Sequence, residues 1–88
     1  MAINKEEERL RIGRELAARR KEKQMNQTQV AERCGLQQAH IARIETGRFS
    51  VGLDTLAAVA DALDCTVEII GKADNRRRRP KRSPDKEE

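Results

Sequence analysis

One stretch of the chain, residues 27–46, reads QTQVAERCGLQQAHIARIET and contains side chains that can form specific hydrogen bonds. A glutamine such as Gln38 can form two hydrogen bonds with adenine, and an arginine such as Arg43 can form two with guanine. The methyl group of Ala39 can contact the methyl group of thymine. These residue types can therefore read the edges of base pairs, provided that one rigid element presents them together.

The spacing of apolar and small residues in the same stretch predicts such an element. It fits a helix, a tight turn and a second helix packed across the first. The inward positions are Val30, Ala31, Cys34, Ile41 and Ile44. Gly35 can adopt the left-handed conformation that ends the first helix, and Ala31 leaves room for a close crossing. In this arrangement the outer face of the second helix is free to enter the major groove of DNA.

Capping residues and helical periodicity predict four helices. Asn4 and Asn26 are good N-caps, and each is followed three residues later by a glutamate or a glutamine, as in a capping box. The predicted helices span residues 5–23, 27–34, 38–45 and 53–63, and a break near the middle of the last one is left open. Gly13, inside the first helix, is interpreted as a weak point that costs about 1 kcal/mol relative to alanine.

Residues 66–70 have the alternating, β-branched pattern of a strand, with Val67 and Ile69 on one side. A single strand leaves its backbone groups unpaired, and no other segment of the chain has strand character. The economical solution is that two copies pair these strands across a two-fold axis, which predicts a homodimer held by Val67 and Ile69. The alternative is that the segment packs as extended chain over the helices.

Charge divides the chain into two parts. Residues 1–71 carry 11 lysines and arginines against 11 aspartates and glutamates, whereas residues 72–88 carry 8 against 4, so the net charge of +4 belongs to the second part. We therefore expect a folded domain over residues 1–71 and a disordered basic tail over residues 72–88, where no apolar side chain is large enough to offset the entropy cost of ordering. The arginine-rich run from Arg76 to Arg82 is either a solvated tail or an arm that lies along phosphates.

Composition argues against several other classes of protein. Phe49 is the only Phe, Tyr or Trp, which leaves no platform for stacking single-stranded bases. Cys34 and Cys65 lack the paired spacing of a zinc or redox site, so we interpret them as small buried residues of a cytoplasmic protein. One histidine and no paired nucleophile and base argue against an enzyme, and we expect no cofactor and no metal. We also expect a soluble protein, because no segment has the length of a signal peptide or a membrane span.

Residues 27–46, with Arg20 before them and the predicted helix at 53–63 after them, resemble the Cro and phage-repressor family of helix-turn-helix proteins, also called XRE-type regulators. The resemblance covers residues 10–64. It rests on six anchors that agree in type and spacing: Val30, Ala31, Gly35, Leu36, Ile41 and Ile44. It implies an all-α fold, a lambda-repressor-like bundle of four or five helices, whose third helix enters the major groove of an operator. We expect a short C-terminal β-strand and the basic tail to follow this bundle.

The resemblance also implies roles for individual residues. Gln27 matches the residue at the start of the second helix that touches a phosphate and braces the reading helix. His40 and Arg48 match positions near the DNA backbone. Four residues match the positions that face base edges: Gln37, Gln38, Ala39 and Arg43. The plain alternative is that these polar residues form an ordinary solvated face.

Arg20 shares one face of the first predicted helix with the apolar residues Ile12 and Leu16. Burying an unpaired arginine costs several kcal/mol, so this position demands a partner. The resemblance supplies one, because Arg20 and Glu45 match an ion pair between the first helix and the end of the third. We expect this ion pair to be structural, and to hold the reading helix in place without contacting DNA.

The end of the predicted domain, LDCTVEII, resembles the ending of short HipB-like antitoxins of bacterial toxin–antitoxin operons, in which a strand pairs across a dimer. The leading hypothesis is a dimeric, sequence-specific repressor of bacterial or phage origin that binds a double-stranded DNA operator. The alternative is an antitoxin that binds a toxin protein and regulates its own transcription. A protein-interaction adaptor that has lost DNA binding is a third hypothesis, against which Gln38, Arg43 and Arg48 argue.

Overall fold

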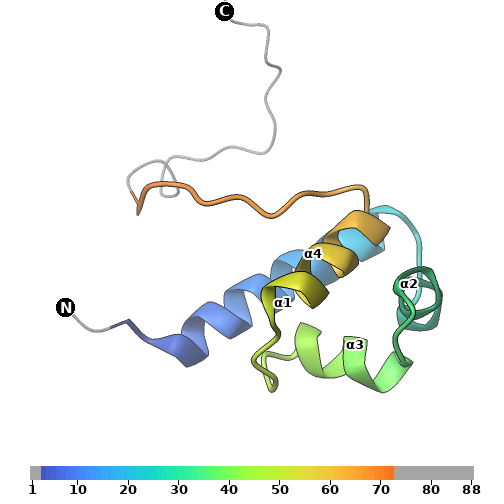
Figure 1. The fold of residues 1–88 in the computed structure, drawn as a ribbon, viewed down its shortest axis with the longest axis horizontal. Helices are drawn as coiled ribbons and strands as arrows, with labels where there is room; N and C mark the ends of the chain where they lie inside the picture. Colours follow the sequence, from blue (N-terminus) through green and yellow to red (C-terminus); the bar gives the residue numbers. More distant parts are fainter. Residues whose placement is uncertain (1–2, 73–88) are drawn as a thin grey trace, which may run out of the picture.

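The computed structural model describes residues 3–72, which form a bundle of four helices (Figure 1). The helices are α1 (Lys5–Glu22), α2 (Gln27–Cys34), α3 (Gln38–Glu45) and α4 (Leu53–Ala62). The long helix α1 packs against α3, and α2 packs against both α3 and α4. The all-α, four-helix architecture predicted from the sequence is confirmed. Every helix boundary lies within one residue of its predicted position, and α4 is unbroken.

The starts of α1 and α2 are set by local hydrogen bonds. The side-chain oxygen of Asn4 accepts from the backbone N–H of Glu7 at 3.0 Å, which satisfies one of the free donors at the start of α1. At the start of α2, Asn26 and Gln29 form a full capping box, in which each side chain accepts from the other residue's backbone N–H at 2.8 Å. The sequence signals that predicted these two starts therefore act through the contacts expected of them.

The turn between α2 and α3 depends on Gly35, which has the left-handed conformation with φ 72° and ψ 28°. The N–H of Leu36 donates to the carbonyl of Ala31 at 2.9 Å and closes the end of α2. Ala31 itself is 2% exposed, as a close crossing of the two helices requires. α3 begins after Gln37, whose side chain makes no capping hydrogen bond. The turn is therefore held by its backbone and by the packing around it.

A small aliphatic core fills the space between the helices. Its buried members are Leu16, Val30, Ala31, Ile41, Ile44, Val59, Ala62 and Leu63. Full burial of a valine, leucine or isoleucine side chain stabilises a fold by about 1.5–3 kcal/mol. The helices α2, α3 and α4 have 8, 8 and 10 residues, and isolated helices shorter than about 12–15 residues are marginal in water. Their stability therefore comes from this shared core.

The two cysteines are free thiols that pack against the edge of the core. Burial raises the pKa of the Cys34 thiol, so this group stays protonated and neutral near pH 7. The Sγ atom of Cys34 lies 3.1 Å from the carbonyl oxygen of Val30, to which it donates. Cys34 thus serves as a small, mostly apolar residue at the end of α2, although both cysteines are partly exposed where full burial was predicted.

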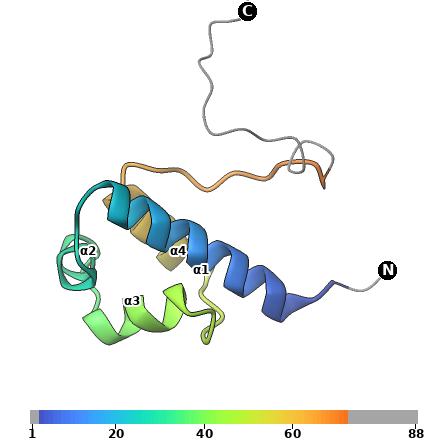
Figure 2. The same cartoon turned by 180° about the vertical axis from the view of Figure 1, so that it is seen from behind.

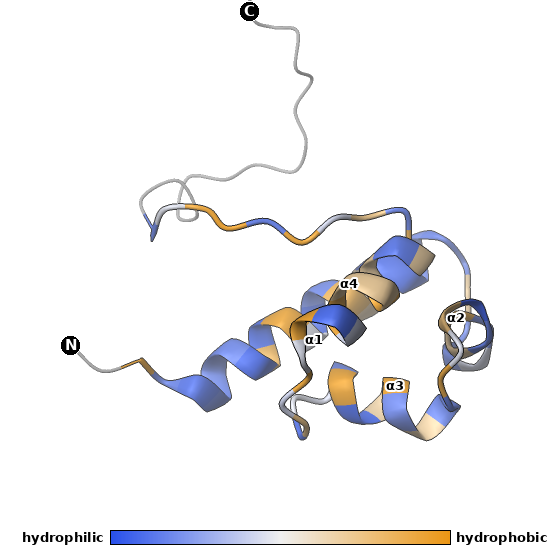
Figure 3. Cartoon of the chain, viewed as in Figure 1, coloured by the Kyte–Doolittle hydropathy of each residue, from blue (hydrophilic) through white to orange (hydrophobic). Residues whose placement is uncertain are grey.

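The chain after α4 turns at Asp64, which has a φ of 59°, and residues 65–71 run back toward the N-terminal side of the molecule without regular secondary structure (Figures 1 and 2). No strand forms within residues 3–72, so the strand expected over residues 66–70 is absent from the single chain. The physical reason is that a lone strand has no partner for its backbone N–H and C=O groups. Val67 is 42% exposed and Ile69 is 97% exposed, and Figure 3 shows hydrophobic positions along this segment. Residues 73–88, nearly all of the predicted basic tail, lie outside the described part of the chain.

The helices α1 and α3 approach each other closely at Gly13. A Cβ atom on Gly13 would lie 2.5 Å from the carbonyl oxygen of Glu45 and 2.6 Å from that of Ile44. Gly47, with a φ of 76°, also packs against α1, and a Cβ atom there would lie 2.8 Å from Cδ2 of Leu10. The interpretation of Gly13 as a weak point was therefore wrong. It considered helix propensity alone, whereas the contact with the end of α3 leaves no room for a side chain.

The substitution Gly13→Ala should destabilise the protein, although alanine is intrinsically the better helix former by about 1 kcal/mol. The added methyl group would overlap backbone atoms at the end of α3, which cannot rotate away. Overpacking of this kind costs about 1–3 kcal/mol. We expect a loss of this size in the free energy of unfolding, measured by urea denaturation and followed by circular dichroism.

Gly52→Ala is the matched control, because it adds the same methyl group where nothing lies within 4 Å and the φ of −73° suits any residue. It should cost less than about 1 kcal/mol, since alanine is only a poorer N-cap than glycine for α4. A Gly13→Ala protein as stable as the wild type would contradict the close approach of α1 and α3.

Candidate nucleic-acid interface

The exposed flank of α3 carries most of the polar residues singled out by the sequence. Gln37 precedes the helix, Gln38 and Ala39 lie in its first turn, and Arg43 lies one turn further on, four residues after Ala39. All four are exposed, and residues four apart share one face of a helix. Arg48 is also exposed, in the loop that follows α3. The structure therefore brings the predicted base-facing positions onto one accessible surface.

The opposite flank of α3 is held by the core. Ile41 is 1% exposed and Ile44 is 3% exposed. At the end of the helix, the carbonyl of Ala42 accepts from both the hydroxyl of Thr46 at 3.0 Å and the backbone N–H of Thr46 at 3.1 Å. An eight-residue helix with one side buried and one side exposed is a rigid support for the polar side chains that it presents to solvent.

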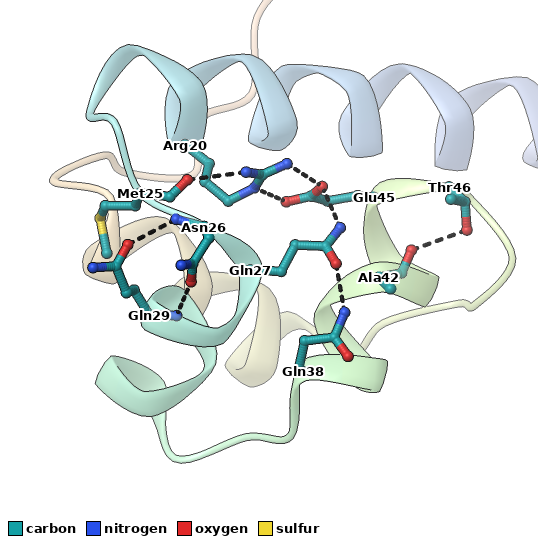
Figure 4. A network of polar contacts seen from close by, with 9 residues as sticks. All are labelled: Arg20, Met25, Asn26, Gln27, Gln29, Gln38, Ala42, Glu45 and Thr46. Atoms are coloured by element: carbon teal, nitrogen blue, oxygen red, sulfur yellow. Dashed lines mark hydrogen bonds and ion pairs between the residues drawn. The ribbon is translucent and has the colours of Figure 1, made fainter.

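Arg20 and Glu45 form an ion pair between the C-terminal part of α1 and the end of α3 (Figure 4). Nε of Arg20 donates to Oε2 of Glu45 at 2.7 Å, and Nη2 donates to Oε1 at 3.0 Å, which is the bidentate geometry of a strong arginine–carboxylate contact. The two side chains are only 13% and 8% exposed. The hydrogen bond from Arg20 to Glu45 raises the pKa of the guanidinium, with a further contribution from the charge of Glu45. Nη1 of Arg20 also donates to the carbonyl of Met25 at 3.0 Å.

Two glutamines continue this network to the surface. Nε2 of Gln27 donates to Oε1 of Glu45 at 3.0 Å, and Nε2 of Gln38 donates to Oε1 of Gln27 at 2.6 Å (Figure 4). We call the four side chains Arg20, Glu45, Gln27 and Gln38 the polar relay. The relay connects α1, α3 and α2 and ends at an exposed position on α3. The resemblance implied that Gln27 braces the reading helix, but it did not identify these two hydrogen bonds. The available signal was that each glutamine is the first residue of one of two packed helices.

The structure places His40 differently from the other predicted residues. Its ring packs edge-on against the ring of Phe49, with centroids 4.8 Å apart and an interplanar angle of 89°. Nε2 of His40 is buried and has no hydrogen-bond partner among the described residues. His40 is therefore half-buried between the flank of α3 and the following loop. Sequence reasoning did not predict this aromatic contact, because the two residues lie nine positions apart across a turn.

The described part of the chain holds no group of three or more His, Cys, Asp or Glu side chains that could bind a metal ion. Within residues 3–72, no helix is both long enough and apolar enough to cross a membrane. The arrangement that the structure does offer is a polar surface on a braced helix, which suits hydrogen bonding to a large polar partner.

A family profile described as helix-turn-helix matches residues 16–70, which covers all of α2, α3 and α4. The chain belongs to the Cro and phage-repressor family of helix-turn-helix proteins. Within this family, α2 and α3 are the two helices of the motif, and α3 is the second of them. The match confirms the family that the six anchor residues indicated.

Two curated relatives of this helix-turn-helix protein support the assignment. An immunity repressor protein of Bacillus phage phi105 is 41% identical over 59 residues, which make up 67% of this chain and 41% of the relative. The uncharacterised HTH-type transcriptional regulator y4dL of Sinorhizobium fredii (strain NBRC 101917 / NGR234) is 39% identical over 61 residues, 69% of this chain and 31% of the relative. The matched part thus spans less than half of the length of either relative.

A solved structure has the same fold as this helix-turn-helix protein. It is the restriction-modification controller protein C.AhdI from Aeromonas hydrophila, with a TM-score of 0.68 and 25% sequence identity. The similarity covers 72% of this chain and 91% of the controller protein. The four-helix arrangement is therefore found over almost the whole of a controller protein and over most of the present chain.

Breaking the ion pair on one side should destabilise the fold more than removing it altogether. Arg20→Met leaves the Glu45 carboxylate buried without its main donor, and we expect a loss of about 3–5 kcal/mol in the free energy of unfolding. The double variant Arg20→Met/Glu45→Met removes both charges and should recover much of this loss. Urea unfolding of the wild type, both single variants and the double variant gives the coupling energy.

The exposed pair of Arg19 and Glu22 on α1 provides the control, with side chains 56% and 65% exposed. Arg19→Met should cost less than about 1 kcal/mol, because exposed pairs contribute little. Equal losses for Arg19→Met and Arg20→Met would show that the ion pair with Glu45 is not a structural brace.

Proposed function

We propose that this helix-turn-helix protein is a sequence-specific regulator that binds double-stranded DNA and represses transcription. The observation that carries the proposal is the two-sided character of α3, whose inner side is buried and whose outer side presents Gln38, Ala39 and Arg43. A helix of this kind fits the major groove of B-DNA, where each base pair shows a distinct pattern of donors and acceptors. The names of a phage immunity repressor and a restriction-modification controller among the similar proteins support a regulatory role.

In this proposal the polar residues divide into two groups. Gln37, Gln38, Ala39 and Arg43 face base edges, and Arg43 is suited to a two-hydrogen-bond contact with guanine. Gln27, His40 and Arg48 lie near the DNA backbone, where contacts orient the protein without reading sequence. Arg20 and Glu45 stabilise the position of α3 and contact no DNA.

The electrostatic part of binding must come from local clusters of cations, because residues 1–71 carry equal numbers of basic and acidic side chains. Arg43 and Arg48 supply two exposed cations at the proposed interface. The run from Arg76 to Arg82 lies outside the described residues. We propose that this run adds contacts to phosphates, which would strengthen binding to all sequences alike and make it more dependent on salt.

Selection of duplexes from random DNA is the experiment that tests the proposed function. We expect a defined motif, and we expect Arg43→Ala to weaken binding to that motif by about 1–3 kcal/mol while the protein stays folded. Arg19→Ala is the control, because Arg19 is exposed on α1, outside the helix-turn-helix motif. It should leave affinity within a few tenths of a kcal/mol of the wild type in mild salt. The absence of any selected motif for the wild type would reject the proposed function.

We further propose that the protein acts as a homodimer through residues 66–70. The exposed side chains of Val67 and Ile69 and the unpaired backbone of this segment support pairing with a second copy across a two-fold axis. Two reading helices related in this way would contact two half-sites of a palindromic operator. Two-fold symmetry in the selected motif would therefore support the dimer.

A charge placed in the pairing segment should disrupt the dimer. For Ile69→Asp we expect a shift toward monomer in sedimentation velocity and weaker binding to the symmetric motif, because the carboxylate would lose hydration in the paired segment. Ile3→Asp is the matched control, since Ile3 is another exposed isoleucine, 65% exposed, and lies outside the proposed pairing segment. It should leave the oligomeric state unchanged. A dimer that survives Ile69→Asp would place the interface elsewhere.

The second candidate function is that of an antitoxin that binds a toxin protein and also regulates its own operon. The feature that favours it is the exposed apolar segment around Ile69, which a protein partner could cover. Co-purification of the chain with a specific protein encoded beside it would favour the antitoxin. Operator binding without such a partner would favour the regulator alone.

A further inference from the structure

In each hydrogen bond of the polar relay one group must donate and the other must accept. The two charged members, Arg20 and Glu45, determine which group does which. A guanidinium can only donate hydrogen bonds, and an ionised carboxylate can only accept them. Arg20 therefore donates to Glu45, and Glu45 can accept from Gln27 but cannot donate to it. The amide of Gln27 must turn its NH₂ group toward Glu45. This orientation follows from the chemistry of the carboxylate, which has no proton to donate.

The same logic extends by one residue to the surface. With its NH₂ group directed at Glu45, Gln27 presents its carbonyl oxygen to Gln38, and this oxygen can only accept. Gln38 must therefore donate one of its two amide N–H groups to Gln27, at a distance of 2.6 Å. The Gln38 amide keeps one free N–H and one free carbonyl oxygen. If Gln27 instead donated to Gln38, the carbonyl oxygen of Gln38 would accept that hydrogen bond, and both N–H groups of Gln38 would stay free.

These two states of Gln38 match different bases in the major groove. Adenine offers an acceptor at N7 beside a donor at N6, which pairs with one N–H and one carbonyl oxygen. Guanine offers two acceptors, N7 and O6, which pair with two N–H groups. The state that the structure shows therefore suits adenine and opposes guanine, whose O6 would face the amide oxygen of Gln38.

We propose that Glu45, paired with Arg20 and acting through Gln27, determines which base Gln38 prefers by setting the orientation of the Gln38 amide. Glu45 and Gln27 are positioning residues in this account, and Gln38 is the residue that touches the base. The inference rests on the proposed function, because it concerns how the same surface reads DNA. It adds a role in specificity to an ion pair that otherwise only stabilises the fold.

The test is a charge exchange, Arg20→Glu/Glu45→Arg, which keeps an ion pair but reverses the relay. An arginine at position 45 would donate to the oxygen of Gln27, whose NH₂ group would then donate to the oxygen of Gln38. Gln38→Ala in an otherwise wild-type protein first identifies the base position that Gln38 reads. At that position we expect the wild type to favour adenine over guanine, and the exchanged variant to lower this affinity ratio by about tenfold or more.

Two further variants separate specificity from stability. Arg19→Glu/Glu22→Arg exchanges an exposed ion pair of α1 that has no link to Gln27, and it should leave the ratio unchanged. Gln27→Met cuts the relay but leaves the ion pair, so the ratio should fall toward one while the preference at the Arg43 position persists. A purely structural role for Glu45 and Gln27 would lower affinity for all duplexes and leave the ratio as it is. A folded exchanged variant that keeps the wild-type ratio overturns the inference.

NMR of the free protein keeps the inference testable if the exchanged variant does not fold. In the wild type, one side-chain N–H proton of Gln38 should be hydrogen-bonded and slow to exchange, while its partner exchanges freely. In Gln27→Met both protons should exchange freely. A wild-type Gln38 amide with no protected proton overturns the inference whatever the outcome of DNA selection. If the wild type selects no DNA motif, the proposed function fails, and the inference about base preference fails with it. The NMR result still shows whether Gln38 donates to Gln27.

Discussion

The carboxylate of Glu45 is the group on which the arrangement of α1, α2 and α3 depends. Its side chain is 8% exposed, and a carboxylate so far from water is costly unless donors surround it. Arg20 donates to it from α1 and Gln27 from α2, so one charge at the end of α3 places three helices relative to one another. The aliphatic core supplies most of the stabilisation but is not directional. Hydrogen bonds to a charge specify distance and angle, and they make the position of α3 specific.

A steric contact acts together with this electrostatic one. At Gly13 the backbone of α1 comes so close to the end of α3 that a Cβ atom would lie 2.5 Å from the carbonyl oxygen of Glu45. Glu45 is therefore fixed in two ways. The absence of a side chain at Gly13 lets α1 pack against the backbone of Glu45, and Arg20 binds its carboxylate. Because α3 has only eight residues, it has little stability outside the bundle. The polar surface on its outer side is a property of the whole fold.

Much of the fold could be predicted because its signals are local. Asn4, Asn26 and Gly35 act on backbone groups a few residues away, and the helix boundaries followed from them. Gly13 was misjudged because its role depends on its contact with the end of α3, more than thirty residues further along the chain. The relay through Gln27 and the packing of His40 on Phe49 also required the tertiary arrangement. The strand over residues 66–70 is a different case, because no other segment of the described residues is a strand that could pair with it.

The relay has a consequence for how such a protein can change during evolution. Ala39 and Arg43 project from α3 with no side-chain hydrogen bond to the interior among the described residues, so either can be exchanged with little effect on folding. Gln38 is linked through Gln27 to the buried carboxylate of Glu45. New binding preferences can therefore arise one substitution at a time at positions 39 and 43. A change at position 38 has to be accommodated by the buried residues behind it, which makes this position slower to diversify.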